Sequence, residues 1–88
     1  MSTQTDATSI ERVEELVRYI VDGLVDNPDT TSIEVIFEGN NLRVLIEANP
    51  GDVGKIIGRG GRTIKSIRTL ARASVGSPSM HVDIDVEG

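Results

Sequence analysis

The spacing of apolar residues in this 88-residue chain switches between helical and strand periods, and the order of the switches restricts the fold. Apolar residues recur at helical intervals over residues 10–24, alternate over 33–46, return to helical intervals over 53–73 and alternate again over 80–86. A glycine-rich segment, residues 58–61, divides the second helical stretch in two. The predicted order is therefore α-β-β-α-α-β. Because a three-stranded sheet with one apolar face needs a cover, we expect an α+β domain with three helices on one face of the sheet.

Two local signals mark the ends of the first helix. The spacing Thr8-Ser9-Ile10-Glu11 suits a capping box, so we expect the helix to begin near Thr8. Asn27-Pro28-Asp29 should end it, because proline lacks an N–H donor and clashes with the preceding turn. Residues 1–7 are small and polar without periodicity, which predicts a flexible N-terminal tail before a single domain over residues 8–88.

The first alternating stretch predicts a β-hairpin around Gly39 and Asn40. If these two residues form the loop, the apolar side chains of both strands share one face. The facing pairs are then Phe37 and Leu42, Val35 and Val44, and Ile33 and Ile46. Ile36 and Leu45 point to the opposite face, where they form either a small diagonal apolar patch or two incidental surface positions.

Two short helices are expected on either side of the glycine-rich segment. Asp52 should cap the first, which runs to Ile57, and the second should run from about Arg62 to Ala73. The apolar side of the second helix is expected to carry Ile64, Ile67, Leu70 and Ala71.

The charge of the chain is unevenly distributed. With 9 Lys and Arg against 14 Asp and Glu, the formal net charge is −5, which on its own argues against a nucleic-acid partner. Residues 53–76, however, hold six basic residues and no acidic one, which leaves −11 for the rest. On a helical wheel, a basic arc of roughly 120° lies opposite the apolar side of the later helix and comprises Arg62, Lys65, Arg68 and Arg72. A polyanion that approaches these residues responds to their local positive charge, so the negative net charge of the whole chain does not exclude RNA as a partner.

Several classes of function are disfavoured by what the sequence lacks. The chain has no cysteine and one histidine, His81, so we expect no disulfide, no metal site and no catalytic constellation. A P-loop would need Gly-Lys-Ser/Thr, and a dinucleotide-binding loop would need glycine at Thr63. Tyr19 and Phe37 are too few to build a base-stacking platform. With neither a signal peptide nor a long apolar stretch, we expect a cytoplasmic protein without a cofactor or membrane contact.

Glycines lie at the junction of the two later helices and let the chain turn sharply and approach a ligand closely. The start of the second of these helices points unpaired N–H groups at the same place, which favours the anionic backbone of a ligand. Residues 57–67, Ile-Gly-Arg-Gly-Gly-Arg-Thr-Ile-Lys-Ser-Ile, resemble the I-G-x-x-G-x-x-I-x-x-I core of the KH domain, whose G-x-x-G loop clamps about four nucleotides. The element order is similar to the type II arrangement of this domain. Chain length and the approach Asp52-Val53-Gly54-Lys55 resemble the small bacterial stand-alone KH proteins of the KhpA type, and the resemblance runs from Thr8 to Glu87.

The resemblance implies binding of single-stranded RNA. By position in the family's motif, the clamp would consist of Gly58, Arg59, Gly60 and Gly61. Phosphates would be held by Lys55, Arg62 and Lys65. Bases would lie in a groove walled by Ile57 and Ile64. Only one of the two variable loop positions, Arg59, offers a charged side chain, so modest affinity is expected. Arg68 and Arg72 either contact RNA or form a solvated helix face, and the sequence leaves both alternatives open.

Two functions remain from the sequence. The first is an RNA-binding protein that acts as an RNA chaperone or a post-transcriptional regulator. The alternative is a protein-interaction module, working as a homodimer or with a second KH-containing protein, in which RNA binding is secondary. The resemblance permits both.

Overall fold

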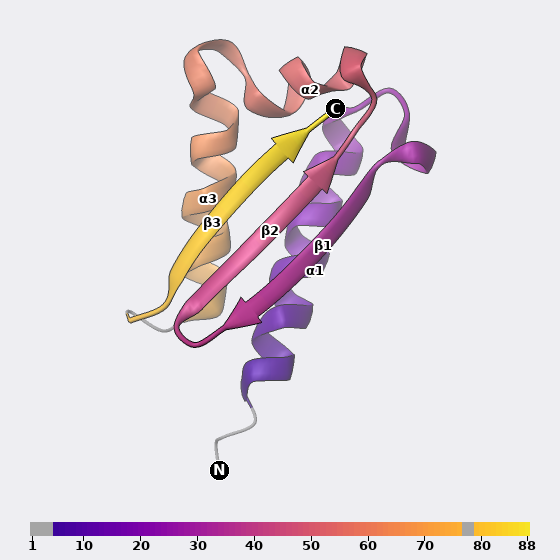
Figure 1. Ribbon diagram of the computed structural model, residues 1–88. Coiled ribbons are helices and arrows are strands. Elements are labelled where there is room, and N and C mark those ends of the chain that lie inside the picture. Colours follow the sequence, from indigo (N-terminus) through magenta and orange to yellow (C-terminus); the bar gives the residue numbers. More distant parts are fainter. Residues whose placement is uncertain (1–4, 77–78) are drawn as a thin grey trace.

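Three helices lie behind one three-stranded sheet in the computed structural model, which describes residues 5–76 and 79–88 (Figure 1). The elements are α1 (Thr5–Leu24), β1 (Ser32–Glu38), β2 (Asn41–Glu47), α2 (Pro50–Ile57), α3 (Arg62–Val75) and β3 (His81–Glu87), with short 3-10 turns at Pro28–Thr30 and Arg59–Gly61. The predicted α+β class and the order α-β-β-α-α-β are confirmed.

The predicted start of the first helix is wrong. Helix α1 begins at Thr5, so Thr8 lies inside the helix and not at its cap. Residues 5–9 contain neither proline nor glycine, so nothing in their sequence stops the helix from extending towards the N-terminus. Residues 1–4 of the expected tail lie outside the described residues. At the other end, α1 stops at Leu24 and Pro28 opens the first 3-10 turn, in line with the stop signal.

The sheet has the order β1-β2-β3, with β2 in the centre. Strands β1 and β2 are antiparallel in the predicted register, which pairs Phe37 with Leu42 across the Gly39-Asn40 loop. Gly39 has a φ of +59°, a backbone conformation that suits glycine at the first position of a two-residue hairpin loop. Strand β3 runs parallel to β2, so residues 48–80 form a crossover that carries α2 and α3 behind the sheet.

An aliphatic core fills the space between the two layers. Its fully buried members come from every layer and include Val13, Val17, Val21, Leu42, Val44, Ile46, Ile56, Ile67 and Ala71. Leu70 does not join them, contrary to the prediction, and is 49% exposed. The buried face of α3 is centred between Ile67 and Ala71, and Leu70 is turned by roughly 90° from that centre.

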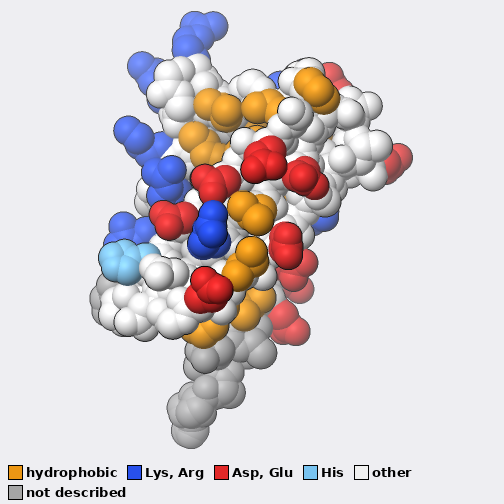
Figure 2. Space-filling view, viewed as in Figure 1, with side chains coloured by type: hydrophobic (Ala, Val, Ile, Leu, Met, Phe, Trp, Pro, Cys, Tyr) orange, Lys and Arg blue, Asp and Glu red, His pale blue; other side chains and the backbone are white. Residues whose placement is uncertain are grey.

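The outer face of the sheet is uncovered in the described part of the chain, and it is acidic. Figure 2 shows acidic side chains over this face, and Lys and Arg side chains along the edge where α3 lies. The outward carboxylates are Glu34, Glu38, Glu47, Asp83, Asp85 and Glu87. Ile36 and Leu45 lie among them and are half-buried, on the face that the alternation predicts.

None of the described helices combines the length and apolarity needed to cross a membrane. Within the same residues, no group of acidic or histidine side chains is arranged to hold a metal ion.

Candidate nucleic-acid interface

The glycine-rich segment connects α2 to α3 at the end of the molecule where β2 and β3 end (Figure 1). Three of its residues have positive φ values, namely Gly58 at +77°, Gly60 at +65° and Gly61 at +77°. The N–H of Gly58 closes α2 by donating to the Gly54 carbonyl at 2.8 Å, and the N–H of Gly61 donates to the Gly58 carbonyl at 3.1 Å. Side chains with a Cβ rarely adopt such conformations, so the sharp turn predicted for this loop depends on glycine.

Gly58 also packs tightly against Thr63 in the first turn of α3. A Cβ at Gly58 would lie 2.6 Å from the Thr63 Cβ and 2.9 Å from the Thr63 nitrogen, closer than van der Waals contact allows. A Cβ at Gly60 or Gly61 would meet no atom within 4 Å. The loop is therefore anchored on one side and open on the other, where another molecule can approach its backbone.

The first turn of α3 has no side-chain cap, although the N–H of Arg62 donates to the Arg59 carbonyl. Its N-cap residue is Gly61, which has no side chain to accept a hydrogen bond from the helix start. The first N–H groups of a helix lack partners within the helix and carry partial positive charge. Such groups favour an anion at the end of α3 that adjoins the loop.

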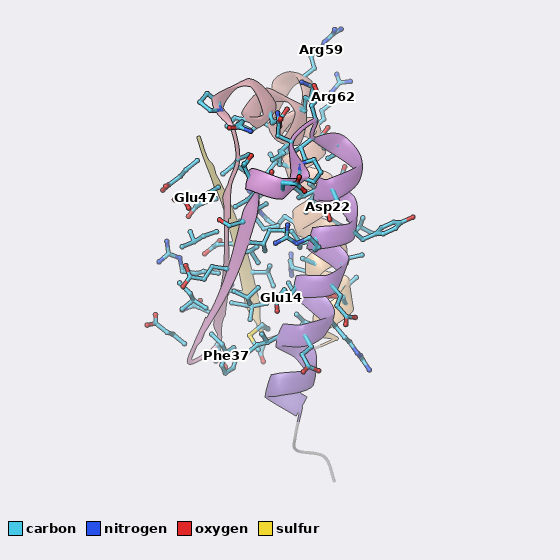
Figure 3. The ribbon with its side chains drawn as sticks, turned by 90° about the vertical axis from the view of Figure 1, so that its right-hand side faces the viewer. Glu14, Asp22, Phe37, Glu47, Arg59 and Arg62 are labelled. Carbon is cyan, nitrogen blue, oxygen red and sulfur yellow. The ribbon has the colours of Figure 1, made fainter. Side chains whose placement is uncertain are left out.

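Three cations of the predicted RNA site, one from the clamp and two from the phosphate-holding set, have charges that no acidic side chain in the described part of the chain pairs. Figure 3 shows Arg59 and Arg62 at the loop end of the molecule, away from Glu14 on α1 and from Glu47 on the sheet. Arg59, Arg62 and Lys65 are all exposed, and none of them is in an ion pair among the described residues. Arg59 belongs to the loop, Arg62 begins α3, and Lys65 lies about one turn further along that helix.

Lys55 differs from the other predicted cations, because its charge is already paired. Its Nζ lies 3.2 Å from Oδ2 of Asp26 and 3.5 Å from Oδ1 of Asp52, and it donates to the Gly51 carbonyl at 3.4 Å. The hydrogen bond and charge of Asp26, followed by those of Asp52, raise the pKa of Lys55 despite partial desolvation. A phosphate at Lys55 would have to compete with two carboxylates.

Asp52 has a structural role that the sequence did not reveal. The prediction that it caps α2 is wrong: Asn49 is the N-cap and Pro50 follows it, so Asp52 lies within the first turn. A proline is well suited to the first helical position, and Pro50 was the available signal for this start. The side chain of Asp52 is 1% exposed and reaches back towards the end of α1.

The Asp52 carboxylate accepts three hydrogen bonds there. Its Oδ1 accepts from the backbone N–H of Asp26 at 3.2 Å, and its Oδ2 accepts from the backbone N–H and the side-chain amide of Asn27 at 3.1 and 3.2 Å. Burial alone would raise the pKa of Asp52, but these bonds and the one from Lys55 outweigh it and lower the pKa. The carboxylate therefore fixes the start of α2, and with it the loop, to the end of α1.

The two predicted groove residues lie in different surroundings. Ile64 is partly buried and packs against the hydrophobic core. Ile57 is also half-buried, but within the described residues it is not one of the side chains that pack against that core. Of the two, Ile57 is better placed to offer apolar surface to a ligand.

Comparison with known proteins gives a consistent result. The family described as KhpA/KhpB, KH domain, matches residues 14–86. RNA-binding protein KhpA of Mycobacterium tuberculosis is 41% identical over 78 residues, which cover 89% of this chain and 91% of the relative. The proteins of the same name from Streptomyces coelicolor and Halalkalibacterium halodurans are 38% and 34% identical, over 85% and 81% of this chain and 95% and 93% of their own lengths. The matched range contains α2, the loop and α3.

Proposed function

The chain belongs to the KhpA/KhpB KH-domain family, and from this premise we propose that it binds single-stranded RNA and catalyses no reaction. The observation that carries the proposal at the level of residues is the glycine loop, which is open on one side and flanked by free cations. We further propose that the protein works in the cytoplasm as an RNA chaperone or a post-transcriptional regulator.

The clamp itself is proposed to hold the RNA backbone. Gly58 to Gly61 present backbone close to the phosphates, and Arg59, Arg62 and Lys65 supply positive charge beside them. Lys55 contributes least, because Asp26 and Asp52 already balance its charge. The acidic outer face of the sheet repels phosphate, so RNA approaches the loop and α3 and not the sheet.

Bases are proposed to lie against aliphatic side chains beside the loop. Ile57 is half-buried and offers its accessible part to a base, whereas Ile64 packs against the core. Without an aromatic platform, each base gains little stacking energy, which favours modest affinity for a single domain.

Reversing the charge of the loop should abolish most RNA binding. We expect the double variant Arg59→Asp with Gly60→Asp to bind a single-stranded RNA at least tenfold more weakly, because two carboxylates replace a cation beside the phosphates. Aspartate tolerates positive φ better than most residues, and a Cβ at Gly60 meets no neighbour, so the fold should persist. Fluorescence anisotropy with a labelled RNA measures the affinity.

A matched control distinguishes the effect of charge at the loop from the effect of the net charge of the protein. Arg12→Asp with Gly23→Asp makes the same change in net charge on α1, where both residues are exposed and a Cβ at Gly23 meets no neighbour. This control should bind RNA almost as well as the native protein. Equal affinity of the loop variant and the native protein would refute the clamp.

A second candidate function, association with itself or with another KH-containing protein, is favoured by Leu70. This side chain is 49% exposed and lines an open hollow of about 420 Å³ with Lys65, Ser66 and Thr69. Leu70 and Tyr19 are the large hydrophobic side chains that the described part of the chain exposes. Leu70 is turned away from Arg68 and Arg72 on α3, but Lys65 lines the same hollow, so pairing at Leu70 would compete with phosphate contact at Lys65.

If Leu70 mediates pairing, Leu70→Asp should convert a dimer to a monomer in multi-angle light scattering. Leu45→Asp on the outer face of the sheet is the control, since Leu45 is only half-buried and also apolar. A monomeric native protein, or a dimer that only Leu45→Asp disrupts, would contradict the assignment of Leu70.

A further inference from the structure

One flank of α3 carries cations far beyond the loop. Arg62, Lys65, Arg68 and Arg72 are three or four residues apart and so lie on the same side of the helix. At a rise of 1.5 Å per residue, the row extends about 15 Å from the loop towards the far end of α3. Arg62, Lys65 and Arg72 are exposed, and Arg68 is partly so.

The row is also free of internal partners. Elsewhere in the chain, Arg18 pairs with Asp22 at 3.5 Å, Arg43 with Asp85 at 3.4 Å and Lys55 with two carboxylates. The four cations of the row have no ion pair among the described residues, and α3 contains no acidic residue. Four like charges on one helix flank repel one another, so the helix alone gains nothing from them.

The row of positive charge on α3 is bordered by an acidic surface. The sheet beside α3 presents carboxylates on its outer face, and Figure 2 shows the basic side chains gathered along one edge of that face. An anionic chain leaving the loop therefore meets repulsion over the sheet and attraction along α3. The favourable path continues past Lys65 to Arg68 and Arg72.

We propose that this row is an extension of the RNA site, so that the ligand is single-stranded RNA longer than the four nucleotides held by a KH loop. Arg68 and Arg72 each neutralise one phosphate of the nucleotides that leave the clamp. The inference rests on the proposed RNA binding at the loop. It adds that the RNA is longer than four nucleotides and that two further residues contact its phosphates. These contacts go to phosphates, so they add affinity without base preference.

The dependence of affinity on salt tests the extension directly. Each phosphate neutralised on a single strand adds about 0.7 to the slope of log affinity against log salt. We expect the native protein to show a slope steeper by about 1.4 on a decauridylate than on a tetrauridylate. Arg68→Gln with Arg72→Gln should remove this difference and leave the tetrauridylate slope unchanged. Arginine and glutamine have similar helix propensities, so α3 should remain folded, which circular dichroism verifies.

A control with the same charge change distinguishes direct contact from the overall field. Arg12→Gln with Arg43→Gln also removes two positive charges, from exposed positions on α1 and β2, and should leave both slopes nearly unchanged. The extension is refuted if the α3 variant keeps the native decauridylate slope, if the control lowers that slope equally, or if the α3 variant weakens tetrauridylate equally. The proposed function fails separately, if neither RNA binds or if the loop double variant binds both normally.

Discussion

Gly58→Ala should lower the free energy of unfolding by about 3 kcal/mol or more, the largest effect of any single loop substitution. Two costs add at this position. The φ of +77° and ψ of 169° belong to a region that only glycine occupies readily, and the new Cβ would overlap Thr63. A domain of this size has a stability of roughly 4–13 kcal/mol, so the substitution should remove between about a quarter and three-quarters of it. Urea denaturation followed by circular dichroism measures the change.

Two other glycines serve as controls for this prediction. Gly61→Ala faces the same positive φ but meets no atom, so it should cost only about 1–2 kcal/mol. Gly54→Ala lies within α2, has open space around it, and should stabilise the protein by about 0.5–1 kcal/mol. If Gly58→Ala is no more harmful than Gly61→Ala, the contact with Thr63 does not constrain the loop.

Asp52→Asn should produce the largest loss of stability among replacements of the acidic residues, on the order of 10 °C in melting temperature. Both carboxylate oxygens accept hydrogen bonds from N–H groups, and an amide can offer only one oxygen to them. The amide NH₂ would face a donor, and Lys55 would lose one of its two partners. Asp22→Asn is the control, since its exposed pair with Arg18 contributes little, and it should shift the melting temperature by at most a few degrees.

The contribution of Asp52 should also depend on pH in a defined direction. Its pKa is lower in the folded protein than in the unfolded chain, so its stabilising effect is complete above the ordinary aspartate pKa and is lost in acid. The difference in melting temperature between the native protein and Asp52→Asn should therefore narrow as pH falls from about 5 towards 3. A constant difference over this range would mean that the ionised carboxylate is not what fixes α2.

Local patterns in the sequence predicted most of the fold. The register of β1 and β2 follows from strict alternation on both sides of Gly39 and Asn40, because a shift by one residue would turn every apolar side chain to the solvent. The sharp turn at residues 58–61 follows equally from its glycines. These features depend on neighbours along the chain, which is why they could be inferred.

Apart from the start of α1, the errors and omissions concern how segments distant in the sequence pack together. Asp52 lies close enough to a helix start to suggest a cap, but its actual partners, Asp26 and Asn27, lie in the connection just after α1. The same part of the chain pairs Lys55 with Asp26, a contact that the sequence did not indicate. Leu70 lies at the border of the apolar face of α3, where spacing alone does not decide whether a side chain is buried.

The parallel pairing of β2 with β3 has a consequence for the order of folding. The hairpin of β1 and β2 is local and can form within microseconds, whereas β3 can pair with β2 only after residues 48–80 have been synthesised and arranged. The loop that we propose as the clamp lies inside that connection, and the two helices beside it gain their support from the sheet as the connection closes. During translation, a chain should therefore acquire its hairpin first and its capacity to hold RNA last, so that RNA binding marks a chain whose fold is complete.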